Sequence, residues 1–462
     1  MKKYDIVVLG GGPGGYVAAI RAAQLGKKTA IIENDKLGGI CLNWGCIPTK
    51  ALLKNAEVLH YVKNSKQFGI DIPTFSVNFN ETIKRSRDVS QRLSKGVEFL
   101  MKKNNINHIQ GWGSFKSPNE LEVLKGKKKD LIEADKIVIA TGARPRILEN
   151  MKPDGKQIIT SKDAMVLKKV PKKIIIIGAG AIGAEFAYFF NEFGTEVHLI
   201  EMQNNILPVE DEEISKEVEK SFIKAGIKIY KNAFVTKIEK LKTKLKVHTE
   251  ISGKSKIMNT DIVLNAVGVI GNIENIGLEK LGIKTSKGSI EINEFNQTSI
   301  ENIYAIGDVT GPPWLAHVAS AQGNIAVEHA FNYSTNPLDY SNIPGCTYCQ
   351  PQVASIGITE FEAKELGHEI KVGRFDFKAS GKALATGDTT GFVKIIFDAK
   401  YGELLGCHIV GNNATELIAE LSVAKALETT WEEIAMTVHA HPTLSEAIME
   451  AALDAFGRNV HK

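Results

Sequence analysis

Three features of the sequence predict an α/β fold. An apolar run, a glycine-rich turn, an alanine-rich stretch and a second apolar run that leads into a glutamate follow one another at 4–33. The same order returns at 172–201, and the chain from 342 onward mixes strand and helix patterns without a third copy. The predicted fold class is therefore two Rossmann-like, dinucleotide-binding domains followed by a C-terminal α+β domain, for which dimerisation is the expected role.

Length and composition limit the classes of protein to consider. The 462 residues are too many for one hydrophobic core. A net charge of +4, from 57 basic and 53 acidic residues, predicts no attraction to nucleic acid. We expect no membrane insertion, because no stretch approaches the roughly 18 apolar residues of a span, and no signal peptide at 1–9. Five cysteines are too few for an extracellular disulfide framework, which favours a reducing, cytoplasmic location.

The first repeat contains Gly10, Gly12 and Gly15 in a GxGxxG pattern between a strand and a helix. Gly10 would make the tight turn, Gly12 would let a pyrophosphate approach the backbone, and Gly15 would let the helix pack on the strand. Glu33, at the end of the second strand, would accept hydrogen bonds from a ribose hydroxyl. Together these residues predict a dinucleotide site.

A pair of cysteines, Cys41 and Cys46, follows in the stretch GGICLNWGCIPTK at 38–50. Two interpretations are open from the residues alone. The pair is either a redox disulfide or two small buried apolar side chains near a turn. Helical patterns follow at 51–64 and 85–103, and then short strands at 112–132.

A third strand is expected at 137–139, and Thr141 and Gly142 would form a turn with close backbone approach to a ligand. The second repeat contains Gly178, Gly180 and Gly183, followed by Glu201. The first glycine and the glutamate are 23 residues apart in both repeats. An acid at this position favours NAD over NADP, because a 2′-phosphate would meet a like charge.

The chain after the second repeat is expected to be rich in strands at 225–268, with a later strand that ends at Gly307 and Asp308. Asp308 is equally well explained as a simple turn cap or as a ligand contact. His317 would open a helix. In the last part we expect a strand at 392–397 and helices from 414 and 445. Cys346 and Cys349 lack a second cysteine pair, so no metal site is predicted, and Cys407 should be a core residue.

Two dinucleotide units with a CxxxxC stretch after the first resemble the flavoprotein disulfide reductases, the FAD-dependent pyridine nucleotide-disulfide oxidoreductases, over essentially the whole chain. The stretches at 38–50, 137–145 (IVIATGARP), 304–309 (YAIGDV) and 439–446 (HAHPTLSE) carry this resemblance. In detail they are similar to the members that oxidise dihydrolipoamide. The resemblance implies FAD on the first unit and NAD on the second. It also implies four domains: 1–149 (FAD-binding, with the redox disulfide), 150–272 (NAD-binding), 273–341 (central, completing the FAD site) and 342–462 (dimerisation).

The resemblance also assigns roles to individual residues. Cys41 would exchange with substrate, and Cys46 would lie nearer the flavin. Lys50 and Glu185 would pair beside the flavin, and His441 with Glu446 would act as acid and base from the partner subunit. The residues expected at FAD are Gly10, Gly12, Gly15, Glu33, Lys50, Gly113, Thr141, Gly142, Asp308, Ala316 and His317, and those expected at NAD are Gly178, Gly180, Gly183, Glu201 and Gly268.

The catalytic role of His441 has a structural alternative. Thr443 and Glu446 have the spacing of a capping box at a helix start, preceded by Pro442. Both interpretations are compatible, because Glu446 could cap the helix and orient the ring. His439 is the weaker candidate, since the family's base comes immediately before the proline.

The resemblance thus implies a homodimer that oxidises protein-bound dihydrolipoamide to lipoamide and reduces NAD. Its partners would be lipoyl domains and the acyltransferase core of 2-oxo acid dehydrogenase complexes, or a glycine-cleavage system. The alternatives are a glutathione or mercuric reductase type and a nucleotide-binding scaffold without turnover. The chain departs from the family pattern at VGVIGN (267–272), at AHV (316–318) and at Trp314, which leaves the cofactor contacts there open.

Overall fold

The computed structural model describes residues 2–461. The chain forms two compact units, each of which is built from three separate stretches. The first unit comprises Met1–Leu52, Asn80–Arg146 and Gly268–Leu338, and the second comprises Leu53–Phe79, Ile147–Val267 and Asp339–Lys462. The division into four domains expected from the sequence stays a prediction.

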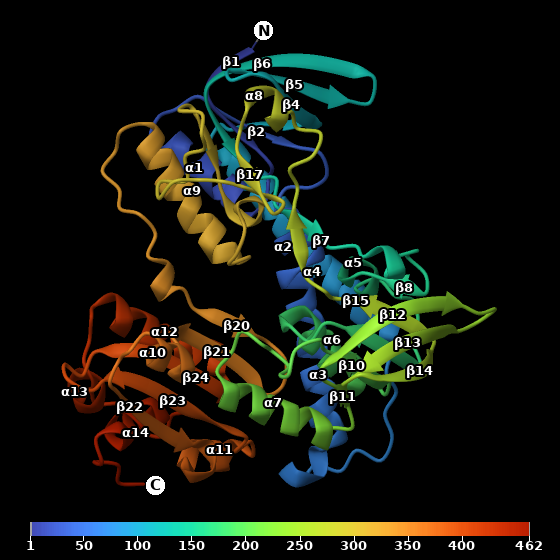
Figure 1. The fold of residues 1–462 in the computed structure, drawn as a ribbon, viewed down its shortest axis with the longest axis vertical. Coiled ribbons are helices and arrows are strands. Elements are labelled where there is room, and N and C mark those ends of the chain that lie inside the picture. Colours follow the sequence, from blue (N-terminus) through green and yellow to red (C-terminus); the bar gives the residue numbers. More distant parts are fainter. Residues whose placement is uncertain (1, 462) are drawn as a thin grey trace. The chain divides into compact units, whose positions relative to one another are not determined.

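The first unit is built on a seven-stranded sheet (Figure 1). Its strands run in the order β3-β2-β1-β6-β5-β4, and β19 pairs with β6. The neighbours of β1 and β2 are parallel, whereas β5 and β4 continue the sheet as an antiparallel meander. The bounds are β1 (Lys2–Leu9), β2 (Thr29–Glu33), β3 (Asn107–Gln110), β4 (Trp112–Ser117), β5 (Glu120–Lys125), β6 (Lys128–Ile139) and β19 (Ile303–Ala305).

Apolar runs form the central strands of this sheet because both of its faces are buried. Ile6, Val7 and Val8 of β1 are each 0% exposed, and Val8 pairs with Ile31 and with Val138. The two apolar runs of the first repeat form β1 and β2, as expected, and the strand predicted at 137–139 is confirmed as part of β6.

Two helices, α1 (Pro13–Gln24) and α9 (Ala316–Ala330), lie side by side in this unit (Figure 1). Glycines let their backbones approach closely: a Cβ added to Gly14 would lie 2.8 Å from the carbonyl oxygen of Ala319. The helix predicted to open at His317 is α9, which begins one residue earlier.

Three helices form around the cysteine stretch, namely α2 (Gly39–Trp44), α3 (Cys46–Lys63) and α4 (Phe79–Lys103). Gly45 separates α2 from α3, because its φ of −148° and ψ of −116° are not helical. The helices predicted at 51–64 and 85–103 are confirmed as the later parts of α3 and α4, each of which begins earlier than expected.

The second unit contains a parallel sheet with the strand order β11-β10-β9-β15-β8. An antiparallel meander, β12-β13-β14, confirms the strand-rich character predicted for 225–268. The elements are β8 (Ile158–Ile159), β9 (Lys173–Ile177), α6 (Ala181–Glu192), β10 (Glu196–Ile200), α7 (Glu212–Lys224), β11 (Lys228–Tyr230), β12 (Ala233–Lys240), β13 (Leu245–Ile251), β14 (Lys254–Thr260) and β15 (Ile262–Asn265).

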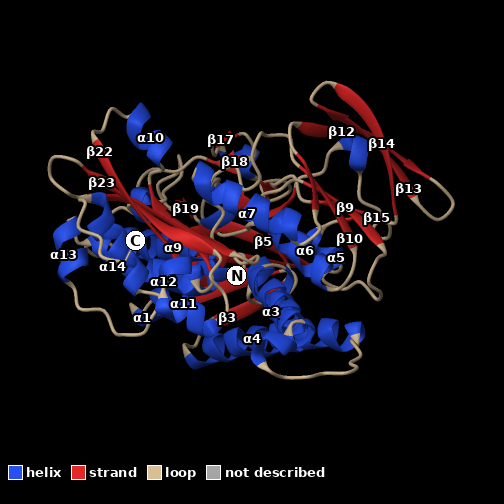
Figure 2. Ribbon diagram, turned by 90° about the horizontal axis from the view of Figure 1, so that it is seen from below, coloured by secondary structure: helices blue, strands red, loops and turns tan. Residues whose placement is uncertain are grey.

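The same unit contains a five-stranded antiparallel sheet with the order β20-β21-β24-β23-β22, on which the helices α12 and α14 pack (Figure 2). Cys407 is 0% exposed in the core between them, as predicted. The predicted strand at 392–397 and the helices from 414 and 445 are present. The bounds are β20 (Gly345–Thr347), β21 (Gln352–Gly357), β22 (Ile370–Asp376), β23 (Gly391–Asp398), β24 (Leu404–Gly411), α12 (Ala414–Ala426), α13 (Trp431–Met436) and α14 (Glu446–Ala455).

Shorter elements complete the two units. The first contains β7 (Ala143–Pro145), β16 (Val269–Gly271), α8 (Leu278–Leu281), β17 (Thr285–Ser286) and β18 (Ser289–Ile290), and the second contains α5 (Ser161–Ala164), α10 (Glu360–Glu365) and α11 (Gly381–Thr386). None of the helices within 2–461 has the length and apolar character needed to cross a bilayer.

Candidate active site

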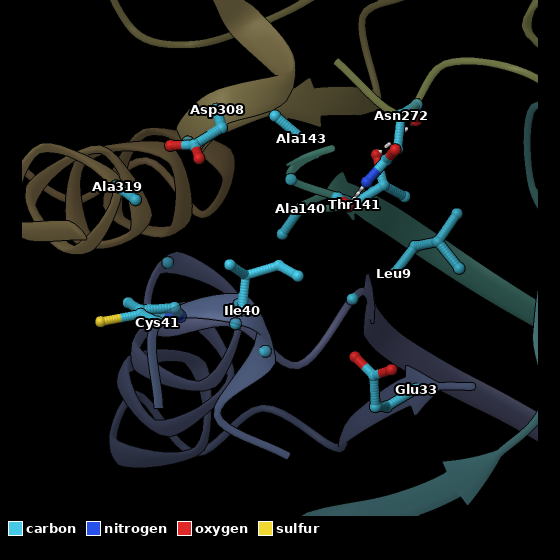
Figure 3. A pocket seen from close by; sticks show the side chains of 18 of the residues that line it. Leu9, Glu33, Ile40, Cys41, Ala140, Thr141, Ala143, Asn272, Asp308 and Ala319 are labelled. Atoms are coloured by element: carbon cyan, nitrogen blue, oxygen red, sulfur yellow. Dashed lines mark hydrogen bonds between the residues drawn. The ribbon is translucent and has the colours of Figure 1, made fainter. Parts of the chain in front are cut away.

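A cavity of 430 Å³ opens in the first unit where β1, β2 and β6 end (Figure 3). Leu9, Glu33 and Ala140, which lie at or just after these strand ends, line it together with the first turn of α1. The carboxyl ends of parallel strands and a helix N-terminus are the usual surroundings of a bound nucleotide, because the helix end attracts phosphate.

The glycine turn between β1 and α1 is closely packed on one side and open on the other. Gly10 has a φ of +111°, and a Cβ there would lie 2.2 Å from the carbonyl oxygen of Ala140. A Cβ on Gly15 would lie 1.9 Å from the carbonyl oxygen of Gly10. A Cβ added to Gly12 would lie no closer than 4.0 Å to any heavy atom beyond its chain neighbours. The turn therefore leaves room beside Gly12 for a ligand to approach the backbone.

Glu33 accepts hydrogen bonds from two backbone N–H groups, one of which lies in this turn. Its Oε2 accepts the N–H of Gly11 at 2.8 Å, and its Oε1 accepts the N–H of Asp35 at 2.8 Å. Each carboxylate oxygen can accept a second hydrogen bond. Glu33 can therefore still accept a hydrogen bond from a ribose hydroxyl, as expected. Its second role, accepting hydrogen bonds from two backbone N–H groups, was not apparent from the sequence.

The second repeat has the same geometry. Gly178 has a φ of +97°, a Cβ on Gly183 would lie 1.9 Å from the carbonyl oxygen of Gly178, and Gly180 has open space beside it. Glu201 Oε2 accepts the N–H of Ala179 at 2.7 Å, and its Oε1 accepts that of Gln203 at 2.9 Å. Gly268, expected at the same cofactor, belongs to a stretch of the first unit and has a φ of +100°.

Cys41 and Cys46 both line the cavity of the first unit, and no disulfide joins them here. Cys41 lies on α2 and Cys46 is the first residue of α3. The hydrogen bond between the two thiols is the main cause that raises the pKa of Cys41, and burial raises it further. Lys50 acts in the opposite direction through its positive charge. Because the Cys41 thiol holds its proton, thiol exchange at Cys41 calls for a separate base.

Asp308 lies at the same end of the cavity as Cys41 (Figure 3). Burial raises the pKa of Asp308 to about 6. Within 2–461 its carboxylate receives no side-chain or backbone hydrogen bond, and it does not cap the short helical turn Gly307–Thr310. An acceptor without a donor fits a polyol hydroxyl, so the turn-cap explanation is not supported. Together with the open glycine and the helix end, it fits the FAD expected from the sequence.

Most residues expected at FAD line this cavity, but two do not. Lys50 and His317 are absent from its lining, although Lys50 is close enough to lower the pKa of Cys41 and His317 lies in the first turn of α9. The lining contains Gly10, Gly12, Gly15, Glu33, Gly113, Thr141, Gly142, Asp308 and Ala316.

Asn272 is a lining residue whose contact the sequence did not reveal. Its side-chain N–H donates to the carbonyl oxygen of Thr141 at 2.9 Å, and the Thr141 hydroxyl donates to the carbonyl oxygen of Asn272 at 2.8 Å (Figure 3). The two residues are 131 positions apart, so only the fold brings them together. Trp44 and Trp314 also line the cavity.

Glu185 lies on α6 and is 4% exposed. Its Oε1 accepts the N–H of Tyr348 at 3.1 Å, which ties α6 to the turn after β20. Lys50 belongs to the first unit and Glu185 to the second, and their pairing stays a prediction.

His441 and Glu446 form a close pair just before α14. The distance between His441 Nδ1 and Glu446 Oε1 is 2.9 Å, and Glu446 Oε2 accepts the N–H of Thr443 at 2.8 Å. The Thr443 hydroxyl donates to the carbonyl oxygen of Ala440 instead of capping α14, so the expected capping box is only half formed. The carboxylate nevertheless both holds the turn and contacts the ring.

His439 is in a different environment. Its Nε2 lies 2.7 Å from Glu420 Oε1, and its side chain is 6% exposed, against 77% for His441. The ring of His441 is therefore the more exposed of the two, and its catalytic role stays a prediction.

The second cysteine pair has a structural explanation. Cys349 is 0% exposed and its thiol donates to the carbonyl oxygen of Pro351 at 3.2 Å, whereas Cys346 lies on β20. Within 2–461 no group of three or more His, Cys, Asp or Glu side chains could hold a metal ion.

Known proteins are similar to this sequence over nearly its whole length. A family described as "Pyridine nucleotide-disulphide oxidoreductase" matches 4–323, and its "dimerisation domain" matches 343–452. The chain is 49% identical to a dihydrolipoyl dehydrogenase from Rhizobium etli, and the match covers 99% of both chains. It is 47% identical to a dihydrolipoyl dehydrogenase from Zymomonas mobilis, again over 99% of both.

Solved structures agree with these relatives. LpdA from Mycobacterium tuberculosis matches with a TM-score of 0.91 and 27% identity, over 98% of this chain and 99% of that one. The HOCl-induced flavoprotein disulfide reductase RclA from Escherichia coli, solved as a Cu(II) complex, matches with a TM-score of 0.88 and 26% identity, over 98% and 99% of the two chains.

Proposed function

The chain belongs to the pyridine nucleotide-disulphide oxidoreductase family, and from this membership we propose that it oxidises protein-bound dihydrolipoamide to lipoamide and reduces NAD to NADH. It is an FAD- and NAD-dependent dihydrolipoyl dehydrogenase. The observation that supports this function most directly is that Cys41 and Cys46 line the same cavity as the glycine turn of the first repeat. A redox pair and a nucleotide cofactor would thereby share one space.

The first step is thiol exchange. His441 of the partner subunit takes the proton from one thiol of dihydrolipoamide, and the resulting thiolate attacks the sulfur of Cys41 in the Cys41 to Cys46 disulfide. A mixed disulfide forms and Cys46 leaves as a thiolate. The second substrate thiol then attacks the substrate sulfur of the mixed disulfide, which releases lipoamide and leaves Cys41 reduced. Two electrons now reside on the dithiol.

Bound FAD supplies the two-electron link between this dithiol and NAD. Residues of this chain would hold and orient the cofactor. Gly12 and the N-terminal end of α1 would bind the pyrophosphate, and the Asp308 carboxylate would accept a hydrogen bond from a ribityl hydroxyl. Lys50 and Glu185 would lie beside the flavin. In the second repeat, Glu201 would accept from the NAD ribose while its backbone bonds keep it in place.

The proposal includes a homodimer, because the proton acceptor for one subunit's disulfide would come from the other. The match of 343–452 to a dimerisation domain supports this arrangement. Lipoyl domains and the acyltransferase core of a 2-oxo acid dehydrogenase complex, or of a glycine-cleavage system, would be the partners. A cytoplasmic location is proposed as well, because a low cysteine content fits a reducing compartment.

Turnover assays test the proposal. We expect the purified protein to be yellow, to oxidise dihydrolipoamide with NAD, and to be much slower with NADP or with glutathione. Cys46→Ser should abolish dihydrolipoamide oxidation, whereas Cys346→Ser, a cysteine outside the cavity, should keep it. Normal turnover by the Cys46→Ser variant would contradict the mechanism. A colourless protein without turnover would favour the scaffold alternative.

A further inference from the structure

The helix α4 presents a row of buried serines to the cysteine stretch. Ser86, Ser90 and Ser94 are spaced by four residues, so they share one face of α4, and they are 0%, 4% and 4% exposed. Serine is a weak helix former, and a buried hydroxyl needs a partner. Each hydroxyl donates to a backbone carbonyl in the cysteine stretch or directly before it: Ser86 to Pro48 at 2.9 Å, Ser90 to Leu42 at 2.7 Å and Ser94 to Leu37 at 2.7 Å.

Arg87 strengthens the middle of this row. Its Nη1 donates to the carbonyl oxygen of Asn43 at 2.7 Å, and its Nη2 donates to the Ser90 hydroxyl at 3.2 Å. Its guanidinium lies 4.8 Å from the centre of the Trp44 ring. Ser90 and Arg87 are thus linked to each other and to two consecutive peptide groups.

These two peptide groups lie between the cysteines. Leu42 and Asn43 belong to the last turn of α2, which ends at Trp44, and Gly45 interrupts the helix before Cys46. The last carbonyls of a helix lack the N–H partners that a continuing helix would supply. Ser90 and Arg87 supply donors there and thereby fix the segment that joins the two sulfur-bearing residues.

We propose that Ser90, supported by Arg87, is a positioning residue that sets the equilibrium between the dithiol and disulfide forms of Cys41 and Cys46; this inference rests on the proposed function. A disulfide requires the two Cβ atoms to be about 3.5–4.5 Å apart. A segment held in place keeps one thiol at a high effective concentration beside the other, which favours the disulfide. Without the bond from Ser90 to Leu42, the dithiol form gains conformational freedom and becomes more favoured.

The chain offers a matched control in Ser94. Its hydroxyl is as buried as that of Ser90, lies on the same helix face and donates at the same distance, but its acceptor Leu37 precedes Cys41. Ser94→Ala removes the same kind of hydrogen bond without releasing the segment between the cysteines. Ser90→Thr keeps a hydroxyl at the position.

The test uses the flavin-loaded dimer, equilibrated with reduced and oxidised dithiothreitol in varied ratios. Free thiols are then blocked, and the fraction of modified Cys41 and Cys46 is measured by peptide mass spectrometry. In this exchange the protein disulfide gains two electrons and two protons while dithiothreitol closes to its cyclic disulfide. We expect Ser90→Ala to shift the equilibrium constant about tenfold toward the dithiol, equivalent to ~30 mV for a two-electron couple.

Ser94→Ala should stay within about twofold of the unchanged protein, and Ser90→Thr should recover most of the shift. Equal behaviour of Ser90→Ala and Ser94→Ala, or a shift in Ser90→Thr as large as that in Ser90→Ala, would overturn the inference. Failure of the unchanged protein to titrate as a cysteine pair would instead overturn the proposed function, so the two outcomes are distinguishable.

Discussion

Glu446 contacts His441 with one carboxylate oxygen and the backbone of Thr443 with the other. The distance from Oε1 to His441 Nδ1 is 2.9 Å, and Oε2 accepts the Thr443 N–H at 2.8 Å. The backbone bond from Thr443 is the main cause that lowers the pKa of Glu446, and His441 lowers it further. An ionised carboxylate can only accept, so Nδ1 carries the proton and Nε2 is left to take one from a reactant.

Glu446→Gln should therefore slow dihydrolipoamide oxidation by about 10- to 100-fold, because the ring loses the carboxylate that fixes its tautomer and orientation. Steady-state kinetics with dihydrolipoamide and NAD measure the loss. Reduction of an artificial dye by NADH, which needs no thiol exchange, should be unchanged.

Glu420→Gln is the matched control, since Glu420 contacts His439 at 2.7 Å in the same way. Its turnover should stay within about twofold of the unchanged protein, because the ring of His439 is covered. Equal losses in the two variants would show that a histidine-carboxylate contact near α14 matters only for folding.

Glu201→Gln should weaken the preference for NAD over NADP. The carboxylate is held by the N–H groups of Ala179 and Gln203, where it would repel a 2′-phosphate. Removing this charge should lower the ratio of kcat/KM for NAD to that for NADP by at least about tenfold, or ~1.4 kcal/mol. Glu33→Gln, measured with excess FAD, removes the equivalent carboxylate of the first repeat and should leave the ratio unchanged. A changed ratio in Glu33→Gln would mean that the two repeats do not have separate ligands.

Local patterns made the two nucleotide turns predictable, because strand, glycines and helix are adjacent in the sequence and their geometry is set by short-range sterics. The glycine positions Gly10 and Gly178 illustrate this, since each has a positive φ that the GxGxxG spacing implies. The contact between Thr141 and Asn272 was not predictable, because it joins loops 131 residues apart. The hydrogen bond from Ser90 to the Leu42 carbonyl was not predictable either, because a serine within a helical pattern is usually interpreted as a solvent-facing residue.

Lys394 is a charged residue in the buried strand β23, and three acidic side chains compensate its charge. It is 2% exposed on β23 and contacts Asp211 at 3.1 Å, Glu213 at 2.7 Å and Glu360 at 2.7 Å. Burial alone would lower the pKa of Lys394, but the bonds to these acids outweigh it and raise the pKa. The ammonium group therefore stays charged throughout the physiological range.

Lys394→Met should destabilise the protein by about 3–5 kcal/mol, because it leaves the buried carboxylate of Asp211 without its cation. Urea unfolding followed by circular dichroism measures the loss. Lys378→Met, which removes an exposed lysine 3.3 Å from Asp376, should cost less than ~1 kcal/mol. A similar small loss for Lys394→Met would contradict the importance of this cluster.

The stability lost in Lys394→Met should depend on pH, because the acidic partners of Lys394 titrate. Bonds from Lys364 and then from Lys394 lower the pKa of Glu360. An acid with a lowered pKa stabilises the fold above its ordinary pKa, and this contribution is lost as pH falls through the lowered value. The difference between Lys394→Met and the unchanged protein should be largest near neutral pH and shrink below about pH 4. A difference that grew on acidification would have the wrong sign.

Asp308 predicts a pH dependence of the opposite sign for the FAD-free protein. Burial raises its pKa to about 6 from 3.8, so the folded state favours the protonated acid. The resulting stabilisation is complete below pH 3.8 and is lost as pH rises through about 6. FAD-free protein should therefore lose thermal stability between pH 4 and 7 relative to Asp308→Asn, which has no proton to release.

When FAD is bound, hydroxyl donors to the carboxylate should lower its pKa and remove most of this difference. Melting temperatures of both proteins across this range, with and without FAD, test the prediction. If the melting temperatures of the two FAD-free proteins changed with pH in parallel, burial would not destabilise the ionised Asp308 carboxylate. If their difference persisted with FAD bound, the FAD hydroxyls would not contact Asp308.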